Sequence, residues 1–326
     1  MKIGEKNFNV KQNKVYVMGI LNVTPDSFSD GGTYIDTDIA LKHALDMGRE
    51  GADIIDIGGE STRPGHEKIS VQEEIDRVST VISAIKKETD IPISIDTYKP
   101  QVAAAALDAG ADMINDIWGL RYDKFNNVNE DSEYYPCDKA ESSQKETMSM
   151  AELAAARKVP ICIMYNDNLG RNMEERTDEV LVRYLESNSK RSAVELVSSI
   201  REEGVIDRIV WGLEESLDIA YKAGIDKHNI ILDPGIGFAK TQKENLLVVK
   251  NLNQIVKRLG HPVLFAASRK SMIGNVLDLP PEEREEGTLV TTILAAQAGC
   301  RFVRVHDVEK NVRALKMLDG IMGLKD

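Results

Sequence analysis

Eight short apolar runs recur along the chain, and polar residues follow each of them closely. In chain order they are Val15–Ile20 before Asn22, Ile54–Ile57 before Glu60–Arg63, Ile91–Ile95 before Asp96, Met113–Ile114 before Asn115 and Asp116, Ile161–Met164 before Tyr165 and Asn166, Ile230–Leu232 before Asp233, Val263–Ala267 before Ser268–Lys270, and Phe302–Val305 before His306 and Asp307. Stretches with helical spacing separate most of the runs. Eight strands that alternate with helices predict an α/β fold, a (β/α)8 or TIM barrel with a parallel sheet.

The polar residues after the runs predict where function lies. In such barrels the active site is built at the carboxyl ends of the strands. Polar residues also follow strands because loops are polar, and that explanation is adequate for one or two of the eight. It accounts poorly for Asn, Asp, Lys and His residues that recur just beyond the apolar runs.

Length and charge narrow the classes of function. A barrel of this class commonly uses about 250 residues or more, so we expect residues 1–326 to form one domain. The net charge of −12, from 53 acidic and 41 basic residues, argues against a nucleic-acid partner or an anionic membrane surface. An anionic small substrate stays possible, because a few local cations can dominate a site.

Apolar segments and cysteines indicate the compartment. The first residues form no apolar stretch of signal-peptide length, and no later run approaches the length of a membrane span. Cys137, Cys162 and Cys300 show no metal-ligand spacing, and burial is expected for the last two. We therefore expect a cytoplasmic protein.

Helix signals lie between the runs, together with two stretches that exceed the barrel pattern. Helices are predicted over Asp36–Glu50, over Gln101–Ala109 after Pro100, and over Thr288–Ala298. Tyr122–Thr147 lacks apolar periodicity and is predicted to be an exposed insertion loop after the fourth strand. Arg171–Leu217 is longer than one crossover helix, so two helices are predicted between the fifth and sixth strands.

Seven segments, in order along the chain, carry a resemblance to a known family. They are Asn22–Gly32, Asp56–Gly65, Ser94–Thr97, Ile114–Asp116, Leu232–Phe238, Ser268–Ser271 and Arg304–Val308. With these segments the chain resembles the dihydropteroate synthase family over essentially its whole length.

The resemblance implies a transferase of folate biosynthesis. Enzymes of this family join 6-hydroxymethyl-7,8-dihydropterin diphosphate to p-aminobenzoate, which yields 7,8-dihydropteroate and diphosphate. No nucleophile–His–acid arrangement is visible in the sequence, which fits an SN1-like loss of diphosphate before the amine attacks. The resemblance also implies inhibition by sulfonamides, which mimic p-aminobenzoate, and a homodimer.

The pterin needs groups that match its ring edge. A carboxylate can accept two hydrogen bonds from a guanidine-like edge, so Asp233 suits it, while Asp96, Asn115 and Met164 would bind the remainder of the ring. Lys270 would donate to a ring acceptor, and Asp96 would also stabilise positive charge on the pterin methylene. The alternative for Asp96 and Asp233 is that each caps the helix that follows it.

Diphosphate leaves more easily when cations neutralise it. Arg304 and His306 alternate along the last run and would share a face, so they form a predicted anion clamp to which the resemblance adds Thr62. Asn22 matches the family position that meets Mg²⁺ and diphosphate, and Mg²⁺ prefers such oxygen ligands. The predicted catalytic group is therefore Asp96, Lys270, Arg304 and His306.

The p-aminobenzoate site follows from the resemblance and from one hydroxyl group. Its predicted residues are Phe28, Thr62, Arg63, Pro64, Phe238 and Ser268. The loops Thr24–Gly32 and Ser61–Gly65 would close over the substrates and exclude water.

Two positions depart from the family. Tyr165 stands where the family often has histidine, so any role of that imidazole is in question. Ala239 replaces a common glycine, which is a small change unless the backbone there needs a positive φ.

Two alternative functions remain on the sequence alone. The first is a methyltetrahydrofolate-binding methyltransferase, which would not need the segment Thr24–Gly32, the segment Ser268–Lys270 or the clamp of Arg304 and His306. The second is a noncatalytic pterin-binding protein that interacts through the two extra segments.

Overall fold

The computed structural model describes most of the chain. The described ranges are 1–12, 14–24, 37–61, 68–122, 148–166 and 204–323. Predictions for residues 25–36, 62–67, 123–147 and 167–203 therefore lie outside the described residues.

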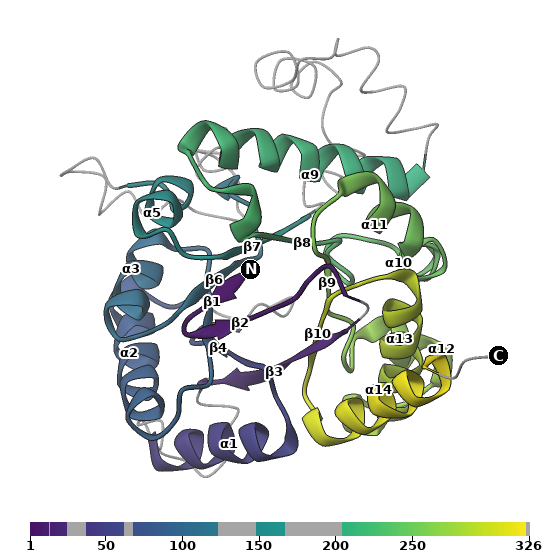
Figure 1. Ribbon diagram of the computed structural model, residues 1–326, viewed down its shortest axis with the longest axis horizontal. Helices are drawn as coiled ribbons and strands as arrows, with labels where there is room; N and C mark the ends of the chain where they lie inside the picture. Colours follow the sequence, from purple (N-terminus) through teal and green to yellow (C-terminus); the bar gives the residue numbers. More distant parts are fainter. Residues whose placement is uncertain (13, 25–36, 62–67, 123–147, 167–203, 324–326) are drawn as a thin grey trace.

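The centre of the molecule is a parallel eight-stranded sheet that curls into a barrel (Figure 1). Its strands are β3 (Tyr16–Asn22), β4 (Ile54–Gly58), β5 (Ile93–Asp96), β6 (Met113–Asp116), β7 (Ile161–Met164), β8 (Ile230–Asp233), β9 (Leu264–Phe265) and β10 (Phe302–Val305). Neighbours follow the order β8-β7-β6-β5-β4-β3-β10-β9. A parallel bridge between Leu232 and Val263 joins the two edge strands, with the Leu232 N–H 2.9 Å from the carbonyl oxygen of Pro262. The predicted TIM barrel is confirmed.

Each of the eight apolar runs contains a strand of this barrel, with small shifts at the ends. The apolar run begins at Ile91, whereas β5 starts at Ile93, after Pro92. β9 contains Leu264 and Phe265 alone, since the chain turns soon afterwards at Ser268.

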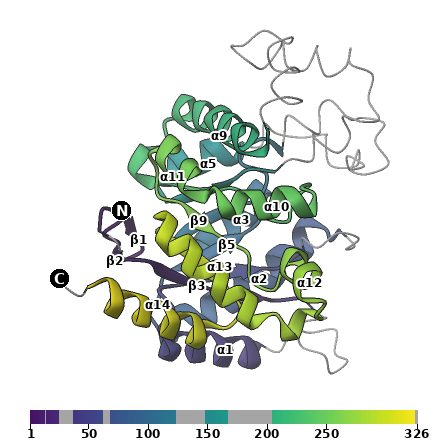
Figure 2. The same cartoon turned by 90° about the vertical axis from the view of Figure 1, so that its right-hand side faces the viewer.

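Helices surround the sheet (Figures 1 and 2). They are α1 (Thr37–Glu50), α2 (Val71–Glu88), α3 (Pro100–Asp108), α5 (Met150–Arg157), α9 (Gly204–Ala223), α10 (Gln242–Lys250), α11 (Leu252–Leu259), α12 (Ser271–Leu277), α13 (Glu285–Ala298) and α14 (Val308–Met322), with 3-10 turns at Lys227–Asn229 and Pro281–Glu283. The three predicted helices correspond to α1, α3 and α13. Of the longer predicted segment Arg171–Leu217, the structure describes the part from Gly204, where α9 begins. No described helix has both the length and the apolar character needed to cross a lipid bilayer.

Alternate residues of the strands contribute to two different cores. Ile55, Ile57, Ile114, Leu232 and Val303 pack with apolar residues of the helices. A second cluster fills the barrel interior toward the amino ends of the strands: Ile3, Phe8, Tyr16, Met18, Ile54, Met113, Cys162, Ile231, Leu264, Ala266 and Phe302. Both described cysteines, Cys162 and Cys300, are buried as expected. The period of two along a strand explains this division.

An N-terminal hairpin covers the amino end of the barrel (Figure 1). Strands β1 (Lys2–Ile3) and β2 (Lys6–Asn7) pair antiparallel, and Phe8 follows them. The Phe8 ring centroid lies 4.8 Å from that of Tyr16 and 5.9 Å from that of Phe302. The sequence pattern did not predict this hairpin, since two-residue strands carry almost no periodicity.

Candidate active site

The inward-facing residues become polar toward the carboxyl ends of the strands. Two positions after an apolar residue of the interior cluster comes a polar one: Asp56 after Ile54, Asn115 after Met113, Asp233 after Ile231, and Arg304 after Phe302. Because a strand repeats every two residues, each polar side chain points to the same side as its apolar predecessor. We refer to these four residues, with Asp96 and Lys270, as the polar rim.

Arg304 is the centre of the polar rim. Its Nε donates to Asp56 Oδ2 at 2.6 Å, and its Nη2 donates to Asp96 Oδ2 at 2.7 Å. Asn115 Nδ2 donates to the same oxygen of Asp56 at 3.0 Å. Burial would lower the pKa of Arg304, but the carboxylates of Asp56, which is fully buried, and of Asp96 and Asp233 together raise it. Arg304 of β10 thus joins β4 and β5 directly, and Asn115 adds β6 through Asp56.

The pKa of Asp96 is shifted toward neutral pH. Burial raises its pKa to about 7; Arg304 opposes this shift, and the like charge of Asp56 adds to it. The Oδ1 atoms of Asp96 and Asp56 are both buried and accept no hydrogen bond from any described residue. Buried acceptors of this kind are rare in folded proteins and are consistent with a ligand that donates to them.

Asp233 and Lys270 lie on the other side of the rim. Asp233 is 3% exposed, and its Oδ1 accepts the Gly235 N–H at 2.7 Å. Lys270 Nζ donates to the carbonyl oxygen of Ile236 and lies 4.6 Å from the centroid of the Phe238 ring. Burial lowers the pKa of Lys270 to about 8 against the attraction of Asp233, and burial also raises the pKa of Asp233.

The turn after Asp233 depends on glycine. Gly235 has a φ of +69°, and a Cβ there would lie 1.9 Å from the carbonyl oxygen of Tyr165. A side chain at this position would displace the backbone that holds Asp233 and Lys270 together.

A small apolar cluster lies beside the polar rim. It consists of Tyr98, Ile117, Trp118 and Met164, with Tyr122 and Phe238 packed against it. The cluster provides flat aromatic and thioether surfaces next to buried hydrogen-bonding groups. Such a combination fits a planar heterocycle with a polar edge.

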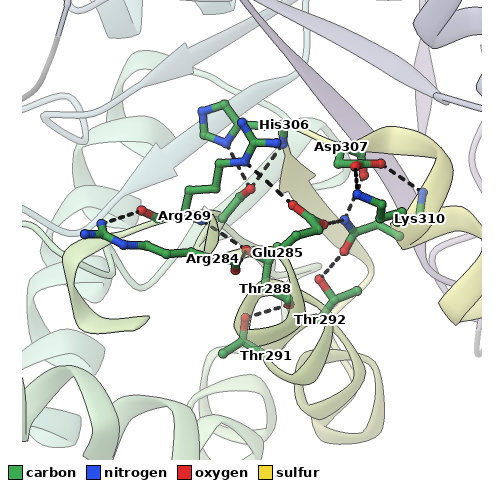
Figure 3. Close-up of polar contacts among 11 residues, drawn as sticks. Arg269, Arg284, Glu285, Thr288, Thr291, Thr292, His306, Asp307 and Lys310 are labelled. Carbon is green, nitrogen blue, oxygen red and sulfur yellow. Dashed lines mark hydrogen bonds and ion pairs between the residues drawn. The ribbon is translucent and has the colours of Figure 1, made fainter. Parts of the chain in front are cut away.

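Ser268 contacts His306, which is labelled in Figure 3, just beyond the ends of β9 and β10. Ser268 Oγ lies 2.9 Å from His306 Nδ1 and accepts the His306 backbone N–H at 3.2 Å. The next residue, Arg269, has a φ of +56°, a left-handed conformation that is unfavourable for a side chain with a Cβ. One predicted p-aminobenzoate residue, Ser268, is thus in direct contact with one predicted diphosphate residue, His306.

Asn22 ends β3 at the same edge of the sheet. It pairs with Gly58, which in turn pairs with Asp96. Its side chain is partly buried and makes no hydrogen bond within the described chain. Among the described residues no group of three or more His, Cys, Asp or Glu side chains could hold a metal ion. A single amide oxygen is compatible with Mg²⁺, which usually keeps several waters and binds substrate phosphates.

The structure brings most of the predicted residues together. Asp96, Asn115, Asp233, Lys270 and Arg304 form the polar rim with Asp56. Ser268 contacts His306, while Met164 and Phe238 belong to the apolar cluster. Phe28, Thr62, Arg63 and Pro64 lie outside the described residues, as do the two predicted loops apart from Thr24 and Ser61.

The alternative role of the two aspartates as helix caps is not observed. Lys99 occupies the N-cap position of α3, and Thr241 caps α10. Asp96 contacts Arg304 and Asp233 contacts Gly235, so neither begins a helix.

Sequence reasoning missed Asp56. The signal was present, since a carboxylate interrupts the run Ile54–Ile57 and is an unusual residue in the middle of a buried strand. The partners of Asp56 could not be predicted, because Asn115 and Arg304 are distant from it in the sequence.

A second missed group lies behind the ends of β4 and β5. Lys99 Nζ contacts Glu60 Oε2 at 2.7 Å, Glu74 Oε2 at 2.8 Å and the carbonyl oxygen of Ile69 at 2.8 Å. The Ile69 N–H in turn donates to Glu60 at 3.1 Å. Lys99 thus ties together residues on both sides of the segment 62–67.

The two departures from the family have different consequences. Tyr165 belongs to the core between sheet and helices, where its ring lies between Arg121 and Lys240 at 5.5 and 4.8 Å. It is not part of the apolar cluster of Met164. Ala239 has a φ of +47°. The backbone therefore needs a positive φ at this position, and the methyl group of alanine is unfavourable there.

Comparisons with known proteins agree with these features. Residues 18–306 match the pterin binding enzyme family. The chain is 46% identical over 323 residues to dihydropteroate synthase of Clostridium beijerinckii, covering 99% of each chain. It is 47% identical over 309 residues to dihydropteroate synthase of Bacillus subtilis, covering 95% of this chain and 89% of the relative.

Solved structures give the same result. A dihydropteroate synthase from Clostridium difficile, crystallised in the presence of pteroic acid, superposes with a TM-score of 0.74 at 40% identity and 98% coverage of both chains. The enzyme from Xanthomonas albilineans in complex with 7,8-dihydropteroate has a TM-score of 0.72 at 32% identity, with 96% and 95% of the two chains covered.

Proposed function

Since the chain belongs to the pterin-binding enzyme family and is a dihydropteroate synthase, we propose that its polar rim holds the pterin diphosphate for attack by p-aminobenzoate. The observation that carries this proposal is the buried group of Asp56, Asp96 and Arg304, in which two carboxylate oxygens lack a partner among the described residues. In folate biosynthesis the products are 7,8-dihydropteroate and diphosphate.

The pterin ring binds between the apolar cluster and the polar rim. The second carboxylate oxygen of Asp233, Oδ2, accepts from the guanidine-like edge of the pterin, since Oδ1 is occupied by Gly235. Asn115 and Asp96 bind the opposite edge, and Met164 contacts the ring face. Lys270 donates to a ring acceptor by exchanging its bond to the Ile236 carbonyl oxygen.

The reaction follows an SN1-like course. The bond between the pterin methylene and the diphosphate oxygen breaks, and the electron pair leaves with diphosphate. The positive charge that develops on the methylene is stabilised by the carboxylate of Asp96, which is effective because little of this side chain, 10%, is exposed to water. The neutral amine of p-aminobenzoate then forms the new C–N bond and releases a proton, so no strong general base is required.

The leaving group is bound by Asn22, Thr62, Arg304 and His306. Mg²⁺, when bound, neutralises charge on the departing diphosphate. Asn22 would hold the ion through its amide oxygen, and His306 is held in place by Ser268 at 2.9 Å. Arg304 is already shared by Asp56 and Asp96, so it links the diphosphate to the same carboxylate that stabilises the cation.

The second substrate lies above the pterin. Ser268 binds the carboxylate of p-aminobenzoate, with Phe28, Arg63, Pro64 and Phe238 around its ring. The Xanthomonas albilineans enzyme has been solved with 4-aminobenzoic acid and the Yersinia pestis enzyme with a sulfonamide drug, which supports competition of sulfonamides at these residues.

The assembly and location are further parts of the proposal. We propose a homodimer in the cytoplasm. Large apolar side chains are exposed on α13 and α14, namely Val290 at 60%, Leu294 at 43%, Met317 at 65% and Ile321 at 53%. A second copy of the chain would cover such a surface.

The experiment that tests the proposal measures diphosphate release from the pterin diphosphate with Mg²⁺, with and without p-aminobenzoate, and identifies the pterin product. Dihydropteroate that forms only with p-aminobenzoate is the expected result. Pterin binding without any product would contradict it, and methyltetrahydrofolate would then be the next ligand to test.

A further inference from the structure

The turn between Ser268 and Lys270 is held in a conformation that its own sequence does not favour. Arg269 lies at its apex with a φ of +56°, where glycine would be the usual residue. Residues held in this region persist when surrounding contacts enforce them, and such residues gather at functional sites. The contacts around Arg269 therefore matter for the two residues beside it.

Three hydrogen bonds form a closed cycle around Arg269 (Figure 3). The Arg269 N–H donates to Thr288 Oγ1 at 3.1 Å. The hydroxyl of Thr288 donates to the carbonyl oxygen of Arg284 at 3.0 Å, and Arg284 Nη1 donates back to the carbonyl oxygen of Arg269 at 3.0 Å. Both backbone polar groups of the strained residue are thus bound by the start of α13.

Residues around this cycle leave space for the Arg284 guanidinium and bury the Thr288 hydroxyl. Gly274 in α12 lies against the Arg284 guanidinium, and a Cβ there would come within 2.3 Å of it. Arg284 Nε also donates to the carbonyl oxygen of Leu279 at 2.9 Å. Thr288 is 1% exposed, so its hydroxyl has no access to water as an alternative partner.

The side chain of Arg269 is held from the same helix. Its Nε lies 3.7 Å from Glu285 Oε2, and Glu285 Oε1 accepts Asn311 Nδ2 at 2.9 Å. Asn311 is in α14, and its side-chain oxygen Oδ1 accepts the hydroxyl of Thr292 at 2.7 Å. The apex of the turn is therefore connected to two helices, while its flanking residues face the reaction.

The consequence concerns Ser268 and Lys270. A left-handed residue between them reverses the chain locally, so that Ser268 meets His306 while Lys270 Nζ reaches Ile236 and lies over Phe238. Without the cycle, Arg269 would relax toward an ordinary conformation and the two side chains would move apart. No part of this cycle touches the substrates in the proposed function.

We propose that Thr288 and Arg284 are positioning residues of the transfer reaction, which hold Arg269 left-handed and thereby place Ser268 and Lys270. This inference rests on the roles of Ser268 and Lys270 in the proposed function. It assigns to the first turn of α13 a part in catalysis that acts through the backbone of Arg269.

The test compares two threonines of the same helix. Thr288→Val keeps the side-chain shape and removes both hydrogen bonds, while Thr291→Val removes a hydroxyl that donates only to the Thr288 carbonyl oxygen at 2.9 Å. We expect Thr288→Val to lower kcat/KM for p-aminobenzoate about tenfold, because small displacements of positioning groups have large kinetic effects. Thr291→Val should stay within about twofold of the wild type, and Thr288→Ser should restore activity.

A second variant opens the cycle at another bond. Arg284→Gln should cause the same selective loss of kcat/KM, so the inference can be tested even if one variant does not fold. Thermal unfolding of all variants is measured in parallel, since a purely structural role would lower Tm for Thr288→Val and leave kcat/KM of the folded protein unchanged.

The inference is overturned if folded Thr288→Val keeps the wild-type kcat/KM, or if Thr291→Val loses as much. Ser268→Ala separates this result from a failure of the proposed function. If Ser268→Ala loses activity and Thr288→Val does not, the positioning role of Thr288 is refuted and the proposed function stands. If Ser268→Ala keeps full activity, the role assigned to Ser268 is refuted.

Discussion

The two ends of the barrel are built from the same strands and have opposite character. Toward the amino ends the interior holds Ile54, Met113, Ile231 and Phe302, closed by Phe8 of the hairpin. Two residues later the same inward positions carry Asp56, Asn115, Asp233 and Arg304. Two residues along each strand thus separate the apolar core that stabilises the barrel from the polar residues proposed to bind the substrates.

The difference shows which end of this fold holds the unfavourable groups that function requires. Buried charges at the carboxyl end are unfavourable unless they are paired, and there Arg304 balances two carboxylates. Left-handed residues gather there too, since Leu120, Ala239 and Arg269 each follow the carboxyl end of a strand. The apolar end contributes the stability that tolerates both.

Removal of the central cation should have the largest effect. Arg304→Met leaves Asp56 and Asp96 buried without their counterion, so we expect unfolding free energy to fall by about 3–5 kcal/mol. Turnover should fall by a factor of about 100 or more, since one electrostatic stabiliser contributes that much. Chemical denaturation and kcat measure the two losses.

A matched control uses the same substitution at the other end. Arg157→Met breaks the exposed ion pair with Asp108, whose side chains are 43% and 63% exposed. It should change stability by about 1 kcal/mol or less and leave kcat unchanged. Equal effects of the two variants would refute the contrast between the ends.

The apolar end should affect stability and not activity. Phe8→Ala removes a ring that is 2% exposed and packs on Tyr16 and Phe302. We expect a loss of about 3 kcal/mol in unfolding free energy, from lost burial and the cavity left behind. Steady-state kinetics at a temperature where the variant is folded should give wild-type kcat and KM values, and altered values would show that the two ends are coupled.

Protonation of Asp96 should control activity near neutral pH. Because burial raises the pKa of Asp96 to about 7, kcat should fall as the pH drops below that value and the carboxylate gains a proton. Asp96→Asn should lower kcat about 100-fold at pH 8 and remove this acidic limb. A pH–rate profile of both proteins measures it, and an unchanged limb in the variant would assign it to another group.

Stability should change with pH in the opposite sense. The folded-state pKa of Asp96, about 7, lies above its ordinary value of 3.8, so the folded protein binds the extra proton between these values. The stability of the wild type relative to Asp96→Asn should therefore decline as the pH rises from about 4 through 7. Asp56→Asn removes a like charge and should move the acidic limb to lower pH.

Relief of backbone strain should have the smallest effect. Ala239→Gly places glycine at a φ of +47° and should raise unfolding free energy by about 1 kcal/mol. Ala105→Gly, inside α3, should lower it by about 1 kcal/mol. Thermal unfolding of both variants checks the opposite signs, and a loss of stability in both would show that Ala239 is not strained.

Much of the fold and the site could be predicted from the sequence. Eight apolar runs located the strands, and the residues after them included Asp96, Asn115, Asp233 and Lys270 of the polar rim. The names of the relatives are those of dihydropteroate synthases, which leaves the methyltransferase and the noncatalytic protein without support. Magnesium, the dimer, the cytoplasmic location and the role of each site residue, including Phe28, Thr62, Arg63 and Pro64, stay predictions.

What escaped prediction has a common cause. Asp56 was visible as a carboxylate inside an apolar run, but its function depends on Arg304, which lies far along the chain. Arg304 was predicted to bind diphosphate, and the structure adds that it also unites two carboxylates. The cycle around Arg269 gave no sequence signal, because threonine and arginine at the start of a helix are ordinary residues.

The sequence by itself determined the alternation of strands and helices, the residues that line the barrel, and the end of it that carries chemistry. These properties depend on periodicity within a few residues, which is a local property of the chain. The tertiary structure decided which charges are paired, which pKa values shift, and which residues are held in strained conformations. Those depend on burial and on contacts between distant segments, and they exist only once the barrel has closed.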